Sequence, residues 1–188
     1  MPTHKTANPA KLTLADTTQA SLLRQASRKG NPPASGEFVH KTSSNHINYH
    51  AAPSTTFKTC FLRISFTLPL QAETAAQYSI IPSVLRRGTA RHPSLAALAI
   101  RCEELYGASV VAMATRVGRQ QLLSFGLQFP GPSMVRNGQK LFRDVIGLAR
   151  ELICEPLVIK GGFDPAIFAS EQEQLVRSIR AIVDEKAS

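Results

Sequence analysis

The stretch TCFLRISFTL, residues 59–68, decides how the rest of the chain is organised. Every even-numbered position from Cys60 to Leu68 is apolar, whereas the odd positions are mostly polar. Because successive side chains of a strand point to opposite faces, this alternation predicts a strand with one buried and one solvated face. Pro69 follows directly and is expected to end the strand.

The hydrophobic periodicity on either side of this strand predicts the remaining elements. Further strands are expected at 47–51, 109–117 and 121–129. Helices are expected over 72–86, between Ser94 and Gly107, and over 138–153 and 164–185. Pro82 should kink the first helix or make its second half a separate turn. The order β-β-α-α-β-β-α-α predicts an α+β fold, in which antiparallel strand pairs alternate with helix pairs that cover the sheet.

Composition narrows the class of protein. The 188 residues are 43% hydrophobic and 19% charged, which excludes a wholly disordered chain. No run of eighteen apolar residues occurs, so no membrane partner is expected. Three scattered cysteines without a C-x-x-C motif give no disulfide framework or zinc ribbon, which favours a reducing, cytoplasmic location.

The net charge of +9 is unevenly distributed. Residues 1–50 contain six basic and two acidic residues, among many Ser, Thr, Asn and Pro. Residues 1–45 are therefore predicted to be a disordered basic tail, and 46–188 the folded domain. A transit peptide to an organelle matrix and a nucleic-acid-binding arm are the alternatives for this tail. Few aromatic residues and no Trp disfavour a nucleic-acid partner.

Several side chains could carry chemistry. His40, His46 and His50 cluster, but no Cys or carboxylate is suitably spaced to complete a metal site, so surface histidines are favoured over metal binding. Cys60 and Cys102 fall on apolar faces, which favours packing over nucleophilic chemistry. A basic group is expected to face solvent or to interact with the helix dipole, with phosphate binding as the alternative. It consists of Arg86, Arg87 and Arg91.

Four short motifs, in order, give a family resemblance. They are Phe57-Lys58-Thr59, Pro69-Leu70, Val84-Leu85-Arg86-Arg87-Gly88-Thr89 and Leu105-Tyr106-Gly107-Ala108. This set resembles the insulinase-like (pitrilysin) metallopeptidase family, and within it an inactive bacterial branch associated with aminopentanol modification of elongation factor P. The resemblance covers roughly residues 46–188. It implies an incomplete N-terminal lobe of that fold, because the chain ends inside the fourth predicted helix.

In active members of this family, two His and one Glu in an H-x-x-E-H motif supply two zinc ligands and a general base. The matching positions here are Ser79 and Ser83 for the His residues and Pro82 for the Glu. A later Glu ligand corresponds to Ser178, with Glu171 as the acidic anchor seven residues earlier. The resemblance therefore implies no catalytic residue, no bound metal and no cofactor.

A strand after Leu-Tyr-Gly-Ala binds peptide by edge pairing in active members. The corresponding positions are Val111, Ala112, Met113, Ala114 and Thr115. An ordinary core strand is the favoured interpretation, and peptide binding the alternative. The sequence thus predicts a non-catalytic binding or assembly subunit, with a homologous zinc-bearing subunit or a second lobe as partner. Its alternative is one half of a split, active zinc peptidase.

Overall fold

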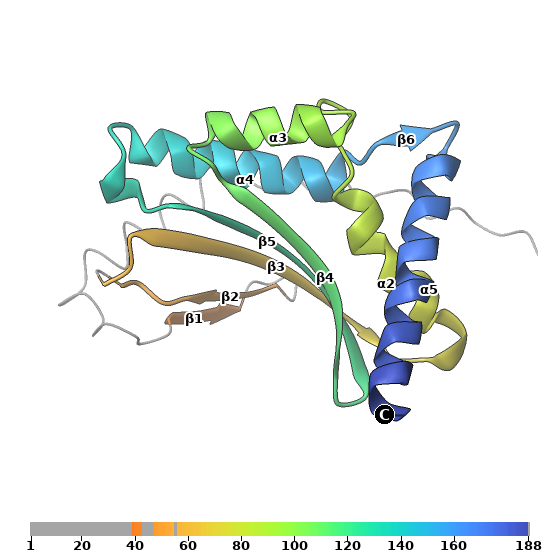
Figure 1. Ribbon diagram of the computed structural model, residues 1–188. Coiled ribbons are helices and arrows are strands. Elements are labelled where there is room, and N and C mark those ends of the chain that lie inside the picture. Colours follow the sequence, from red (N-terminus) through yellow and green to blue (C-terminus); the bar gives the residue numbers. More distant parts are fainter. Residues whose placement is uncertain (1–38, 43–46, 55, 188) are drawn as a thin grey trace, which may run out of the picture. The chain divides into compact units, whose positions relative to one another are not determined.

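A computed structural model describes residues 39–42, 47–54 and 56–187 (Figure 1). The chain divides into two compact units, with the junction between Thr56 and Phe57. The sequence-based boundary between residues 45 and 46 lies inside the first unit.

The first unit contains an antiparallel hairpin. Strand β1 (Val39–Thr42) pairs with β2 (Asn48–Ala51), and His40 lies directly opposite His50. Strand β2 lies within the strand expected at 47–51. The sequence assigned β1 to the tail, because its four residues include a single apolar side chain and show no periodicity. Residues 1–38 and 43–45 of the predicted tail lie outside the described residues.

An antiparallel sheet forms the centre of the second unit. It consists of β3 (Thr59–Pro69), β4 (Ser109–Val117) and β5 (Gln120–Pro130), in the order β3-β5-β4. Strand β5 lies in the middle, with Cys60 opposite Phe129 on one side and Val110 opposite Leu127 on the other. The predicted alternation holds at Cys60, Leu62, Ile64 and Leu68, which are half-buried between exposed neighbours, but not at Phe66, which is 42% exposed.

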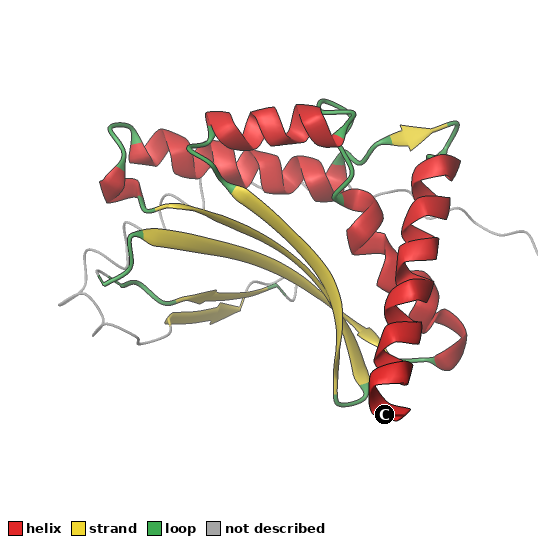
Figure 2. Ribbon diagram, in the orientation of Figure 1, coloured by secondary structure: helices red, strands yellow, loops and turns green. Residues whose placement is uncertain are grey.

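Helices α3 (Leu95–Glu104) and α4 (Gly138–Cys154) cover one face of this sheet (Figure 2). The N-terminus of α3 is capped by the Ser94 hydroxyl, which accepts a hydrogen bond from the Ala97 amide at 3.1 Å. The core between helices and sheet is built from large aliphatic and aromatic side chains, among them Leu98, Leu105, Leu127, Phe129, Leu141, Val145, Leu148 and Leu152. Its apolar burial is the main source of stability.

Helices α2 (Ala72–Leu85) and α5 (Pro165–Ala187) pack against each other, and α2 also contacts β4 and β5. Helix α2 continues through Pro82 to Leu85. Its second half is therefore not a separate turn, which was one of the two predictions for Pro82. Pro82 is fully buried, and its carbonyl still accepts a hydrogen bond from the Arg86 amide at 3.1 Å. Because proline has no backbone N–H group, the helix lacks only the hydrogen bond that the nitrogen of residue 82 would otherwise donate.

The described residues confirm a mixed α+β fold with antiparallel sheets. They also contain short elements that the predicted order β-β-α-α-β-β-α-α does not include. Besides β1, the chain forms a short 3₁₀ turn (Pro132–Met134) and a hairpin of β6 (Val158–Ile159) with β7 (Gly162–Phe163). Two-residue strands carry no periodic signal, which explains why the sequence did not reveal them. Lys160 and Gly161 have positive φ and make the turn of this hairpin. Among the described residues, no helix has both the length and the apolar character needed to cross a membrane.

Replacing Leu127 by Ala should lower the free energy of unfolding by about 3 kcal/mol, because it leaves a cavity in the middle of the core. Leu127 is 1% exposed on the central strand. The matched control is Ile100→Ala on α3, where the side chain is 64% exposed and the change should stay within about 0.5 kcal/mol. Urea denaturation followed by circular dichroism measures both. Equal stability of the two variants would contradict the assigned core.

Candidate functional site

A small pocket lies between α2 and α5. Its volume is about 120 Å³, and side chains from these two helices line it: Ser79, Ile80, Ser83, Glu171, Gln174, Leu175 and Ser178. Three of the four positions that the sequence resemblance assigns to the metal site, Ser79, Ser83 and Ser178, thus line one pocket. The fourth, Pro82, is buried in the same helix and does not line the pocket.

Two serine hydroxyls of this pocket are bound to the protein itself. Ser79 Oγ donates to the Ala75 carbonyl oxygen at 2.8 Å and accepts from Gln121 Nε2 at 2.8 Å. The same Gln121 amide nitrogen lies 3.0 Å from the Ala75 oxygen. On the other helix, Ser178 Oγ donates to the Gln174 carbonyl oxygen at 2.9 Å. The two hydroxyls therefore satisfy helix carbonyls rather than point at a common ligand.

The carboxylate of the pocket belongs to Glu171, which is 3% exposed. The Arg87 guanidinium, at the C-terminal end of α2, forms a hydrogen-bonded ion pair with it. Burying an isolated carboxylate costs a large amount of free energy. The ion pair with Arg87 offsets this cost and so allows the Glu171 carboxylate to be buried. The sequence used Glu171 only as an alignment anchor. Its partner was missed because the two residues are 84 positions apart.

A catalytic zinc ion of the kind found in active insulinase-like peptidases does not fit this donor set. Such an ion needs imidazole or carboxylate ligands on several sides. The pocket instead offers serine hydroxyls and one carboxylate that Arg87 already neutralises. Within the described parts of the chain, no group of three His, Cys, Asp or Glu residues is arranged to hold a metal ion.

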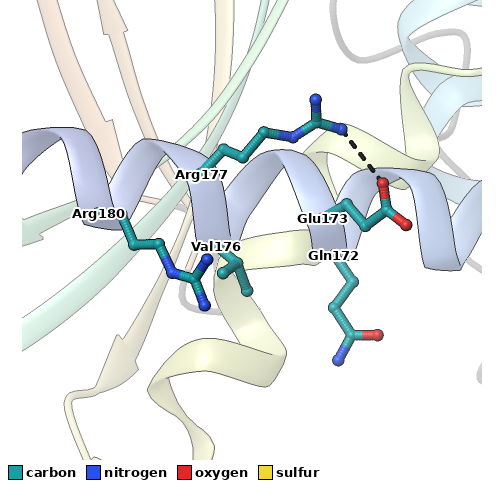
Figure 3. Close-up of a pocket in the computed structure, with 5 residues that line it drawn as sticks. All are labelled: Gln172, Glu173, Val176, Arg177 and Arg180. Carbon is teal, nitrogen blue, oxygen red and sulfur yellow. Dashed lines mark hydrogen bonds and ion pairs between the residues drawn. The ribbon is translucent and has the colours of Figure 1, made fainter.

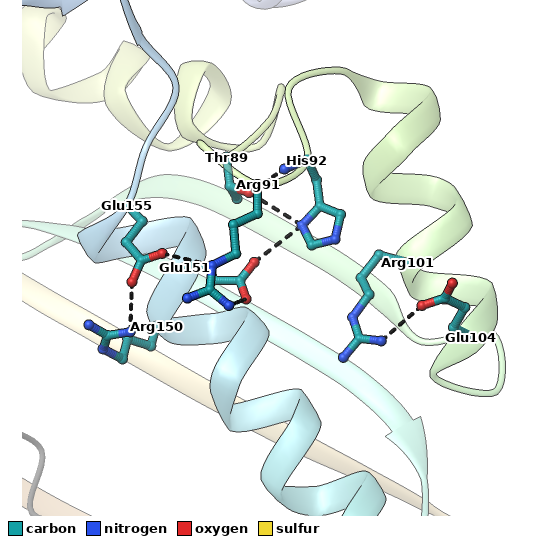
Figure 4. Close-up of polar contacts among 8 residues, drawn as sticks. All are labelled: Thr89, Arg91, His92, Arg101, Glu104, Arg150, Glu151 and Glu155. Carbon is teal, nitrogen blue, oxygen red and sulfur yellow. Dashed lines mark hydrogen bonds and ion pairs between the residues drawn. The ribbon is translucent and has the colours of Figure 1, made fainter.

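A polar network anchors the turn that follows α2 (Figure 4). Thr89 is fully buried, and its hydroxyl accepts a hydrogen bond from the His92 amide at 3.0 Å. The Ala90 amide donates to the Glu155 carbonyl oxygen at 2.9 Å, which ties the turn to the end of α4. These bonds fix the backbone directly after Arg87 and so help to position its guanidinium.

Two of the three arginines in the basic group, Arg87 and Arg91, form ion pairs. Arg91 lies 3.6 Å from Glu151 and 3.3 Å from Glu155, and Glu155 also pairs with Arg150 at 2.7 Å (Figure 4). With Arg87 on Glu171, only Arg86 remains exposed without a described partner. The expectation that these arginines face solvent holds for Arg86 and for Arg91, whose side chain is 64% exposed. It is wrong for Arg87, because its acidic partner Glu171 comes from a distant helix.

The possible peptide-binding segment lies on β4, which pairs with β5 along one edge. Along it, Val111, Met113 and Thr115 are exposed, whereas Ala112 and Ala114 are half-buried. Among the described residues, the other edge of β4 has no strand beside it. Along this edge β4 makes no strand pairing within the described residues, and α2 packs against the strand.

A shallow hollow of about 290 Å³ lies on the surface of α5 (Figure 3). Val176 is its apolar member, and polar side chains surround it: Gln172, Glu173, Arg177 and Arg180. Glu173 and Arg177 pair at 3.2 Å, one helical turn apart. All lining residues come from one helix face, so no side chains from different elements converge on this hollow.

The half-buried cysteines show no sign of nucleophilic chemistry. Burial raises the pKa of both the Cys60 and Cys102 thiols. At Cys102 the nearby Glu103 adds to this rise in pKa, and Arg101 partly opposes it. Both side chains pack against the core, so they are protonated packing residues at neutral pH.

Comparison with known proteins identifies relatives of part of the chain. No protein-family model matches. Over 151 residues, 79% of the chain, the sequence is 30% identical to the probable inactive metalloprotease YmfF of Bacillus subtilis (strain 168), and the match covers 35% of that protein. The crystal structure of a conserved protein from Enterococcus faecalis V583 is similar with a TM-score of 0.69 and 25% identity, over 74% of this chain and 32% of the other.

The chain thus spans about a third of the length of the proteins it matches. The pocket between α2 and α5 thus holds serine hydroxyls and one carboxylate in a chain that is similar to a probable inactive metalloprotease.

Replacing Arg87 by Met should lower the free energy of unfolding by about 3 kcal/mol, because it leaves the buried Glu171 carboxylate without a counter-charge. The matched control is Arg86→Met, which removes the same charge from an exposed neighbour. Urea denaturation measures both changes.

The double variant Arg87→Met/Glu171→Leu should regain most of this loss, because it removes both charges. A double variant that is as unstable as Arg87→Met alone would refute the assigned pair.

Proposed function

We propose that this chain is a non-catalytic homologue of the insulinase-like zinc metallopeptidases that acts as a binding or assembly subunit. One observation carries the proposal: the pocket where active relatives place zinc ligands holds Ser79, Ser83 and Ser178, together with a carboxylate bound by Arg87. The similarity to a probable inactive metalloprotease supports it. The sequence resemblance also suggests that the chain takes part in the modification of elongation factor P.

The chemistry of the pocket argues against hydrolysis of a peptide bond. A zinc peptidase needs a metal-bound water and a general base beside it. Proline at position 82 has no group that accepts a proton, and Glu171 is bound to Arg87. Two of the serine hydroxyls are engaged in hydrogen bonds with helix carbonyls. None of these groups activates water.

Exposed apolar side chains support a role in assembly. Phe61 is 51% exposed and Met113 is 45% exposed, and Val111 lies beside Met113 on the same face of β4. This is the sheet face opposite to the one that α3 and α4 cover, since the alternate residues Cys60, Leu62 and Val110 pack into the core. Apolar side chains gathered on one face are typical of a surface that contacts another protein.

A homologous zinc-bearing subunit is the proposed partner, and one half of a split peptidase is the alternative. The chain spans about a third of the length of the proteins that it matches. In both, a peptide would bind along the free edge of β4. The two differ in whether the assembled complex cleaves peptide.

Purified protein should show no chelator-sensitive peptide cleavage, because the pocket lacks metal ligands and a general base. The measurement is cleavage of a mixed peptide library by mass spectrometry, with and without a chelator, beside an intact zinc peptidase as positive control. Cleavage that scales with protein, disappears with chelator and returns with zinc would overturn the proposal.

Affinity purification of the full chain from its native cells should recover a protein that carries an intact H-x-x-E-H motif. Val111→Asp with Met113→Asp should reduce recovery at least tenfold, because it places charge on the apolar face of β4. The control is Ile100→Asp, an exposed apolar residue on α3. Equal recovery with all variants would argue against this surface, and recovery of no homologous protein would argue against the proposed partner.

A further inference from the structure

Two histidines face each other across the hairpin of the first unit. His40 on β1 lies directly opposite His50 on β2, and both side chains are exposed. Their Nδ1 atoms are 3.2 Å apart and their ring centroids 4.6 Å apart. The pairing of the two strands thus holds two imidazole nitrogens close together at the surface, where an ion from solvent reaches them.

The separation of these nitrogens suits two ligands of one metal ion. A Zn²⁺–imidazole bond is about 2.0–2.1 Å long, and cis ligands in tetrahedral or square geometry are therefore roughly 2.9–3.4 Å apart. The observed 3.2 Å between His40 Nδ1 and His50 Nδ1 falls inside this range. Neither ring needs to leave its strand for both nitrogens to reach one ion.

The neighbouring polar groups favour the tautomer that a metal requires at His40. The Thr42 hydroxyl donates to Asn48 Oδ1 at 2.9 Å, so its oxygen is left as an acceptor. That oxygen lies 3.4 Å from His40 Nε2, which carries the ring proton toward it. His40 Nδ1 then presents its lone pair toward His50. A hydrogen bond from the distal ring nitrogen is the usual support of a metal-binding histidine.

We propose that His40 and His50 bind one divalent transition-metal ion through their Nδ1 atoms, with water in the remaining positions. Imidazole ligands and the order of metal affinities favour Cu²⁺ over Ni²⁺ and Zn²⁺. On binding, His50 carries its proton on Nε2, so both rings stay neutral and no proton is released. This departs from the sequence-based preference for surface histidines, because spacing along the chain does not show that two strands bring these rings together.

This site is independent of the pocket on α2 and α5, and of the proposed function. The ion would link β1 to β2 across the hairpin and would stabilise the pairing of these strands in proportion to its occupancy. Its ligands are two side chains, so exchangeable waters complete the coordination, as they do in open metal sites.

The test is calorimetric titration of the full chain with Cu²⁺, Ni²⁺ and Zn²⁺. The wild-type chain should bind one equivalent, most tightly for Cu²⁺. His40→Phe and His50→Phe should each weaken this binding at least tenfold, because phenylalanine keeps the ring but has no ligand nitrogen. The controls His46→Phe and His92→Phe should bind as the wild type does. Electron paramagnetic resonance of the Cu²⁺ complex should show two coupled imidazole nitrogens.

Circular dichroism of each variant separates lost binding from lost folding. Unchanged affinity in both His40→Phe and His50→Phe would overturn the proposal. So would an equal loss of affinity in His46→Phe or His92→Phe, because the metal would then have other ligands.

Discussion

The central position of β5 is the constraint on which the second unit depends. Its inward side chains, among them Phe125, Leu127 and Phe129, are almost completely buried. Its two edges are occupied by β3 and β4. A Cβ at position 126 would lie 2.6 Å from the Phe61 ring, so any residue other than glycine there would displace this side chain of β3. Strand β5 therefore leaves little freedom in how its neighbours are placed.

The same strand also determines the geometry of the pocket between α2 and α5. Gln121, at the start of β5, is buried and donates through Nε2 to both Ala75 and Ser79 of α2. From the other side, Arg87 joins the end of α2 to Glu171 on α5. The two helices are thus linked to the sheet and to each other by polar groups of the protein. These contacts join the helices through polar groups of the chain itself, although the buried Gln121 Oε1 has no hydrogen-bond partner among the described residues.

The sequence predicted the large elements well and the polar contacts poorly, for a physical reason. Burial alternates along β3 and recurs along α4, so hydrophobic periodicity located both. The serines of the pocket were found only through a family resemblance, since hydroxyl residues give no periodic signal. The Arg87–Glu171 pair and the His40–His50 pair depend on which elements meet in space, and β6 and β7 are too short to show a period.

The hydrogen bonds of Ser79 make it costly to place a metal ligand at this position. A histidine at this position would remove the hydroxyl that joins Gln121 to α2, and its ring would have to fit a pocket of about 120 Å³. A first imidazole binds metal weakly until Ser83 and Ser178 change as well, so each early step has a cost in stability and no gain in activity.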